Sequence, residues 1–232
     1  MALIRLDRPE RRNALDTDGC TKLAAAVREA ADGGARCVVL TGSGGHFCAG
    51  ADLSTVRDEG FAAALRGVLD ALTTLPLPFV AYVEGAALGA GTQLAVACDL
   101  RVAHPSARFG IPAARLGLMV DHWTVQRVAL VAGAGPARAM LLAAEQIDAE
   151  SALRLGLAQR LGHLEDALVW AGEIAALAPL SLAGHKLALN RLEPALADED
   201  VLAAHRTAWA SEDLVEGMAA FRERRPPHFR GA

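Results

Sequence analysis

Two segments of small residues constrain this chain most, because each directly follows a run of residues that favour a buried β-strand. The first run, Arg36–Leu40, leads into Thr41–Gly45 and then into His46–Leu53. The second run, Phe79–Val83, leads into the glycine-rich segment Gly85–Gly91. Short apolar runs of this kind are typical of parallel sheets, and α/β proteins place ligands at the carboxyl ends of such strands. The sequence therefore predicts an α/β fold with ligand-binding loops at these two segments.

The other expected elements follow from local periodicity and from residues that start or stop helices. They are a strand at Ala2–Leu6, a helix capped by Asp16 or Thr17 that runs to about Ala31, a helix from about Val56 to Leu75 stopped by Pro76 and Pro78, and short strands at Leu100–Ala103 and Arg108–Phe109. From about residue 122 we expect helices only. No break in composition marks an independent second domain, so we predict an α/β core at residues 1–175 and a helical region at residues 176–232.

The composition points to small-molecule chemistry. With a net charge of −4, the chain has no basic stripe that a nucleic acid would need. The four cysteines, Cys20, Cys37, Cys48 and Cys98, are scattered and include no Cys-x-x-Cys pair, which argues against a zinc ribbon and a disulfide scaffold and indicates reduced thiols. We find no signal-peptide pattern and no apolar run of about 18 residues, and therefore expect a cytoplasmic protein without a membrane span.

The second glycine-rich segment is expected to begin a helix, whose first N–H groups lack partners within the helix. Such N–H groups can bind the oxyanion that develops on a thioester carbonyl, and each donor contributes about 10²–10³ in rate. Glycine there also lets a ligand approach the backbone closely. The alternative is that both segments are only tight turns between a strand and a helix, and the glycines by themselves do not decide between the two.

Four stretches in order and at the right spacing resemble the enoyl-CoA hydratase/isomerase (crotonase) superfamily. They are Leu6–Leu15, Phe47–Leu53, Val80–Leu100 and Leu141–Gly156, and the similarity covers nearly the whole chain. The resemblance implies a crotonase (ClpP-like) ββα superhelix core, a C-terminal helical region for oligomerisation, and a homo-trimer or hexamer. It also implies a coenzyme A thioester as substrate or ligand, with no tightly bound cofactor. The start is shorter than is usual in the family and lacks the first strand of the opening hairpin, so we expect either that this strand is absent or that the start codon is misplaced.

The resemblance also implies a set of site residues. The backbone N–H groups of Ala51 and Ala90 would form the oxyanion hole. The residues implied to contact the acyl group or coenzyme A are Ala49, Asp52, Leu53, Gly89, Ala113, Trp123, Phe221 and Arg224. Phe221 and Arg224 would meet the adenine and phosphate of a ligand, often one held by a neighbouring subunit. Without the resemblance, the run Arg222–Arg225 would be interpreted as a solvated helix end.

The two glutamates that family hydratases use to hold water and move its protons are missing. Their positions match Gln93 and Ala113, and neither an amide nor a methyl group can transfer a proton. The remaining acidic candidate is Asp121, which aligns with a working aspartate of some family isomerases and of aryl-CoA dehalogenases. It can act as a base if it lies in a desolvated acyl pocket. It can also cap the helix that begins near His122, and the two roles can coexist.

The Gly89-Ala90-Gly91-x-Gln93 motif, the Leu-x-x-Asp-x-Trp segment and the Arg225-Pro226-Pro227-x-Phe229 ending are similar to actinobacterial enoyl-CoA hydratase homologues that lack the glutamate pair. Three functions stay open. The first is a protein that binds fatty acyl-CoA in lipid metabolism with weak or no hydratase activity. The second is an isomerase, or another enzyme that forms an enolate, using Asp121. The third is a hydratase of low activity using Gln93 and a bound water.

Overall fold

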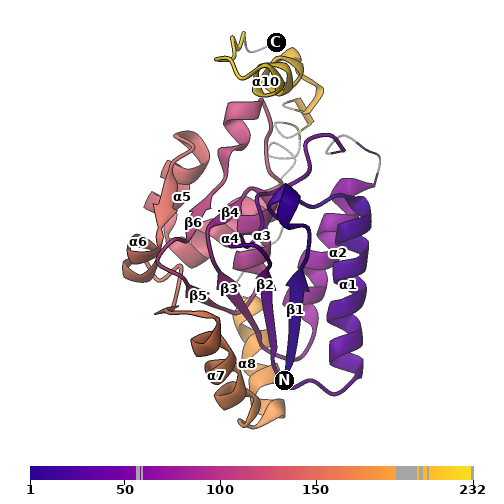
Figure 1. Cartoon of the computed structure of the whole chain (residues 1–232), viewed down its shortest axis with the longest axis vertical. Coiled ribbons are helices and arrows are strands. Elements are labelled where there is room, and N and C mark those ends of the chain that lie inside the picture. The colour runs from indigo at the N-terminus through magenta and orange to yellow at the C-terminus, as the bar shows by residue number, and fades with distance from the viewer. Residues whose placement is uncertain (56–57, 59, 192–202, 204–205, 208, 231–232) are drawn as a thin grey trace.

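The structure is a computed structural model that describes residues 1–55, 58, 60–191, 203, 206–207 and 209–230. A five-stranded parallel sheet forms the centre (Figure 1), with the strand order β1 (Ala2–Leu6), β2 (Val38–Gly42), β3 (Phe79–Val83), β5 (Leu100–Ala103) and β8 (Arg160–Leu161). In a second, three-stranded sheet, β6 (Arg108–Gly110) pairs in parallel with β4 (Ala86–Leu88) and antiparallel with β7 (Gln146–Asp148). The α/β class predicted from the sequence is confirmed.

Helices enclose the central sheet. They are α1 (Thr17–Asp32), α2 (Phe61–Thr74), α3 (Ala90–Ala97), α4 (His122–Ala132), α5 (Ala134–Leu142), α6 (Ala149–Arg154), α7 (Leu164–Ala175), α8 (Pro179–Asn190) and α10 (Glu212–Glu223), with 3-10 turns η1 (Pro9–Arg11) and η2 (Pro112–Leu116). Residues of β3 alternate between two apolar clusters: Phe79, Ala81 and Val83 join the cluster with α1, α2 and α3, whereas Val80 and Tyr82 join the cluster with α7. Burial on both faces explains why the strands are continuously apolar.

Most of the expected elements are present, with two differences. Asp16 caps α1, because its Oδ1 accepts from the N–H of Gly19 at 2.7 Å. The described part of α2 begins at Phe61, and the predicted start at Val56 lies outside the described residues. The prediction that strands end before residue 122 is wrong, since β7 and β8 follow it. These strands have three and two residues, too few for a local pattern, and form by pairing with β6 and β5.

Two buried arginines hold the carboxyl end of α3. The Arg101 guanidinium donates to the carbonyl oxygens of Ala95 and Cys98, and Nε of Arg127 donates to the carbonyl of Val96 at 2.8 Å. Burial lowers the pKa of Arg101 to about 10. Cations at this end of a helix stabilise carbonyls that have no partner within the helix. These contacts fix α3 in the core. They therefore also help to position its first residues, which lie at the predicted site.

The C-terminal region contacts the molecule at two separated places (Figure 1). On α8, the buried Lys186 ammonium donates to the carbonyl oxygens of Leu72 and Leu77 and lies 3.0 Å from Asp99 Oδ2. At the other end of the long axis, α10 packs on η2, and a Cβ at Gly217 would lie 2.4 Å from the carbonyl carbon of Leu116. The division at residues 175 and 176 stays a prediction.

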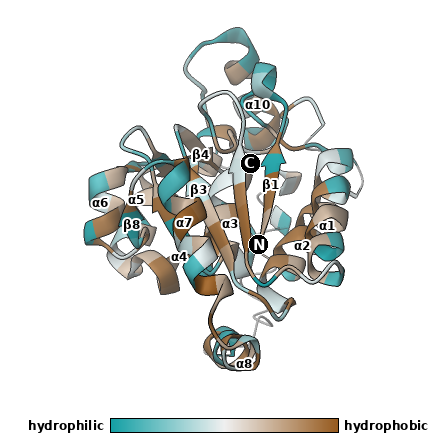
Figure 2. Cartoon of the chain, turned by 60° about the horizontal axis from the view of Figure 1, so that its bottom comes forward, coloured by the Kyte–Doolittle hydropathy of each residue, from teal (hydrophilic) through white to brown (hydrophobic). Residues whose placement is uncertain are grey.

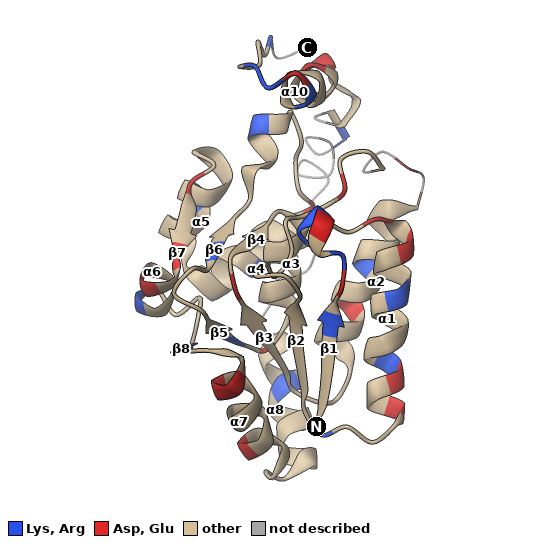
Figure 3. Cartoon of the chain, in the orientation of Figure 1, with Lys and Arg blue, Asp and Glu red and all other residues tan. Residues whose placement is uncertain are grey.

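Colouring by hydropathy shows apolar strands at the centre and polar residues on the outward sides of the helices (Figure 2). Basic and acidic residues are interspersed along α1 (Figure 3). Among the described residues, no single helix is both long and apolar enough to span a bilayer. Helices α7 and α8, which are bent by 107° relative to each other, reach that length and apolar composition only when they are taken together.

Candidate functional site

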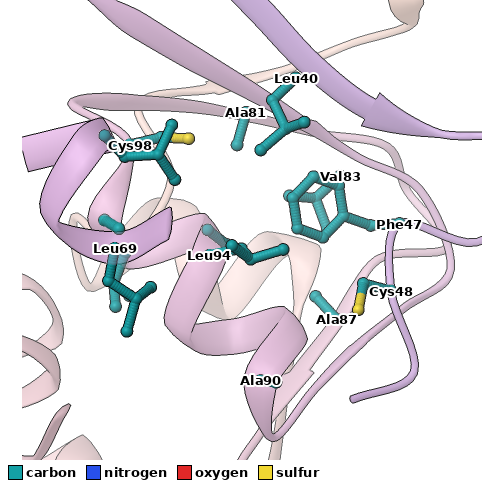
Figure 4. Packing of buried hydrophobic residues seen from close by; sticks show 14 of the residues in the cluster. Leu40, Phe47, Cys48, Leu69, Ala81, Val83, Ala87, Ala90, Leu94 and Cys98 are labelled. Atoms are coloured by element: carbon teal, nitrogen blue, oxygen red, sulfur yellow. The ribbon is translucent and has the colours of Figure 1, made fainter. Parts of the chain in front are cut away.

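Strand pairing brings the two small-residue segments together. The N–H of Cys48 donates to the carbonyl of Ala86 at 2.9 Å, and the N–H of Leu88 donates to the carbonyl of Cys48 at 3.0 Å, which makes a parallel bridge between Cys48 and Ala87. Figure 4 shows Cys48 beside Ala87, with Ala90 where α3 begins. Segments that are about forty residues apart in sequence therefore run side by side at the amino end of α3.

Glycines allow the close approach. Gly50, at φ +113°, and Gly89, at φ +53°, both adopt backbone conformations that favour glycine. A Cβ at Gly50 would lie 2.9 Å from the carbonyl oxygen of Leu88 and 3.8 Å from the backbone nitrogen of Ala90. A Cβ at Gly91 would lie 2.1 Å from the carbonyl oxygen of Cys48, which is well inside van der Waals contact. A larger residue at either position would push the segments apart.

The geometry presents the N–H groups of Ala51 and Ala90 as donors. Ala90 is the first residue of α3, so its N–H has no acceptor within the helix. The residues on either side of Ala51 are hydrogen-bonded to Leu15. The N–H of Leu15 donates to the carbonyl of Gly50, and the N–H of Asp52 donates to the carbonyl of Leu15. In a parallel ladder the intervening N–H points to the opposite side of its strand. Two donors from adjacent segments suit an oxygen that gains negative charge.

The hydratase positions carry no acid. Gln93 lies one turn after Ala90 on α3 and is 8% exposed. Ala113 lies in η2, where it packs against the main apolar cluster. At these two positions the site therefore offers an amide and a methyl group, and only the amide can orient a water molecule.

Asp121 caps α4. Its Oδ1 accepts from the N–H of Thr124 at 3.1 Å and from the hydroxyl of the same residue, while its Oδ2 lies 3.8 Å from Nη1 of Arg66. The carboxylate side chain is 43% exposed, which is not the desolvated setting that a base in an acyl pocket needs. Of the two roles considered for Asp121, the cap is confirmed. His122 follows as the first residue of the helix.

Trp123 is 4% exposed, and the Arg66 guanidinium lies 5.0 Å from its ring centroid. Arg66 also pairs with Asp70 at 2.5 Å on the same helix. The sequence analysis missed Arg66, because the only local signal is an ordinary charge pair four residues apart on α2. Its stacking on Trp123 is a contact between α2 and α4, visible only in the fold.

The remaining residues of the first segment support its backbone. The N–H of Ala49 donates to the carbonyl of Arg12 at 2.9 Å, and Leu53 packs against the main apolar cluster. Asp52 is buried; its Oδ1 accepts from the hydroxyl and the N–H of Ser54. These hydrogen bonds hold the pKa of the Asp52 carboxyl below its usual value. The Asp52 side chain fixes the turn after Ala51, and contact with coenzyme A stays a prediction for all three residues.

Phe221 lies on α10, at the end of the long axis, and Arg224 is the residue after that helix, whereas α3 lies near the middle (Figure 1). Phe221 is 60% exposed, and Arg224 ends the helix in the left-handed conformation at φ 54°. The adjacent Arg225 binds both carboxylate oxygens of Glu216 at 2.6 and 2.8 Å. The structure describes one chain, so contact of Phe221 and Arg224 with a neighbouring subunit's ligand stays a prediction. Within the described residues, no group of three His, Cys, Asp or Glu side chains could hold a metal ion.

Comparison with known proteins identifies the family. Residues 1–232 match the family model described as enoyl-CoA hydratase/isomerase. The chain belongs to this family. Within it, the chain is 47% identical over 237 residues to a protein of Mycobacterium tuberculosis (strain CDC 1551 / Oshkosh) named "Probable enoyl-CoA hydratase echA6", covering 99% of this chain and 95% of that protein. The resemblance to crotonases and to their actinobacterial members is confirmed.

Solved structures with the same fold include two proteins named for coenzyme A thioesters. Carnitinyl-CoA hydratase from Mycobacterium avium is 31% identical, with a TM-score of 0.84, over 99% of this chain and 95% of that one. Methylmalonyl-CoA decarboxylase in complex with 2-nitronate-propionyl-CoA is 25% identical, with a TM-score of 0.89, over 99% and 95%. The crotonase fold predicted from the sequence motifs is therefore confirmed.

The cap and the base make different predictions for Asp121→Asn. Asn caps helices about as well as Asp, so the free energy of unfolding should fall by no more than a few tenths of a kcal/mol. Since the geometry favours the cap, we also expect exchange of acyl α- or γ-protons with solvent deuterium to be absent or equal in wild type and variant. Mass spectrometry of the recovered acyl-CoA measures this exchange. Exchange by the wild type that the variant loses would restore Asp121 as the base.

Proposed function

We propose that this chain binds a fatty acyl-CoA or enoyl-CoA thioester in lipid metabolism and hydrates enoyl-CoA weakly or not at all. The observation that carries the proposal is the close approach of the two small-residue segments: a Cβ at Gly50, next to Ala51, would lie 2.9 Å from the carbonyl oxygen of Leu88 and 3.8 Å from the backbone nitrogen of Ala90. A thioester oxygen that receives both donors would be bound and polarised. Membership of a family whose named members act on coenzyme A thioesters supports this ligand class.

Weak hydration follows from positions 93 and 113. General acid or base catalysis contributes about 10²–10⁴ per group, and an amide and a methyl group supply neither. Gln93 can still orient a water molecule, which is the basis of the low-activity alternative. An isomerase that uses Asp121 is disfavoured by the exposure of that carboxylate and its hydrogen bonds to Thr124. We further propose a cytoplasmic homo-trimer or hexamer, as the family resemblance implies.

The test is binding measured together with turnover. A ligand that binds only the folded state raises its stability by RT ln(1 + [L]/Kd), so a saturated long-chain acyl-CoA at about 100 times Kd should add about 2.7 kcal/mol. Melting temperatures report this shift, and the absorbance of crotonyl-CoA and longer enoyl-CoAs reports hydration.

We expect a melting shift with hydration at the background rate. Coenzyme A without an acyl group is the control, and it should shift the melting temperature less because it has no thioester carbonyl. An unchanged melting temperature with acyl-CoA would contradict binding, and rapid hydration by the wild type would contradict the assignment of positions 93 and 113.

A further inference from the structure

The start of β4 is held by side chains from two other parts of the chain. The N–H of Gly85 donates to the Ser106 hydroxyl at 3.1 Å, and the N–H of Ala86 donates to Nδ1 of His46 at 3.1 Å. Gly85 is at φ +54°, and a Cβ there would lie 2.6 Å from the same imidazole nitrogen. His46 is therefore in direct contact with the backbone that leads, four residues later, to Ala90.

The imidazole supplies an acceptor that the backbone ladder lacks at this point. Along the parallel pairing, the N–H of Phe47 donates to the carbonyl of Glu84, and the N–H of Cys48 donates to the carbonyl of Ala86. The carbonyl of His46 accepts instead from the side-chain amide of the buried Asn13, at 2.7 Å. Nδ1 of His46 accepts the Ala86 N–H, which requires the neutral tautomer with its hydrogen on Nε2. The side chain thus extends the pairing of the two segments by one hydrogen bond.

We propose that His46 is a positioning residue, whose Nδ1 fixes the spacing between the Ala51 and Ala90 donors by holding Ala86. From His46 to Ala51 and from Ala86 to Ala90 the chain is short, and the Cys48 and Leu88 hydrogen bonds transmit the alignment between the segments. An N–H left without its acceptor would draw the start of β4 toward water, and oxyanion donors need placement within about half an ångström. The inference rests on the proposed binding of an acyl thioester.

The experiment uses p-dimethylaminocinnamoyl-CoA, whose absorption moves to longer wavelength when its thioester carbonyl is polarised. His46→Phe keeps a planar ring but has no acceptor, and His46→Asn places an acceptor oxygen close to the position of Nδ1. We expect His46→Phe to lose more than half of the wild-type spectral shift and to bind about tenfold more weakly. We expect His46→Asn to keep most of the shift, with affinity within about threefold.

His185→Phe is the matched control, because it makes the same chemical change at an exposed position of α8 and should leave the shift unchanged. A full shift in His46→Phe, or equal losses in the Phe and Asn variants, would overturn the inference while leaving acyl-CoA binding intact. No binding by the wild type would contradict the proposed function itself.

If His46→Phe does not fold, amide hydrogen exchange provides a second measurement. We expect the Ala86 amide to be protected in the wild type and in His46→Asn, because its hydrogen bond persists in both. Rapid exchange of that amide in the folded wild type would overturn the role of His46.

Discussion

Gln93→Glu combined with Ala113→Glu is expected to create hydratase activity where the wild type has little. The proposed site already supplies the oxyanion donors, so the two substitutions add the missing proton transfer. Each group contributes a factor of about 10²–10⁴ to the rate, and the two factors do not simply multiply. Gln93 is 8% exposed, and burial would raise the pKa of a carboxyl there, which suits a general acid. The rate at which the absorbance of crotonyl-CoA falls measures hydration, and we expect this rate to rise by more than about 10²-fold.

The control for this pair is Ala113→Gln in the wild-type background. It adds a side chain of similar size at position 113 and leaves both positions without a titratable group. It should therefore show no gain in hydration. A wild type that already hydrates crotonyl-CoA fast, with a rate that neither variant changes, would show that other residues carry the chemistry.

Gly91→Ala is expected to damage both stability and the site. The added Cβ would lie 2.1 Å from the carbonyl oxygen of Cys48, so either α3 or the first small-residue segment must move. Overpacking of this kind lowers the free energy of unfolding by about 1–3 kcal/mol. Since Ala90 precedes Gly91, the displacement also moves one oxyanion donor, and we expect at least a tenfold loss of acyl-CoA affinity. Denaturant unfolding and titration calorimetry measure the two effects.

Gly67→Ala is the matched control, because Gly67 also lies inside a helix, and a Cβ there meets nothing within 4 Å. This change should be neutral or raise the free energy of unfolding by about 0.4–1 kcal/mol. Equal effects of the two substitutions would show that helix propensity, and not the contact with Cys48, governs position 91.

Some features could be predicted because they depend on a few neighbouring residues. The strand Phe79–Val83, the glycine segment after it and the helix that begins there are local patterns, and all three are in the structure. The caps at Asp16 and Asp121 likewise depend on residues three positions away. For the family and its fold, the decisive information was the resemblance of four ordered motifs, and the match over residues 1–232 confirms it.

Other features depend on residues far apart in the chain. The strands β7 and β8 form only against β6 and β5, and Lys186 on α8 finds its acceptors at Leu72, Leu77 and Asp99. Nothing in the local sequence around these residues specifies such partners.

The sequence by itself was enough to locate the two small-residue segments, to indicate the family of the chain, and to show that positions 93 and 113 carry no carboxylate. The tertiary structure alone decided that Gly50 lies against the backbone of Leu88, that the Asp121 carboxylate is partly exposed beside Arg66, and that His46 holds Ala86. The physical reason is that composition and glycine spacing act through local backbone conformation, whereas the direction and burial of a polar side chain depend on which distant segment packs against it.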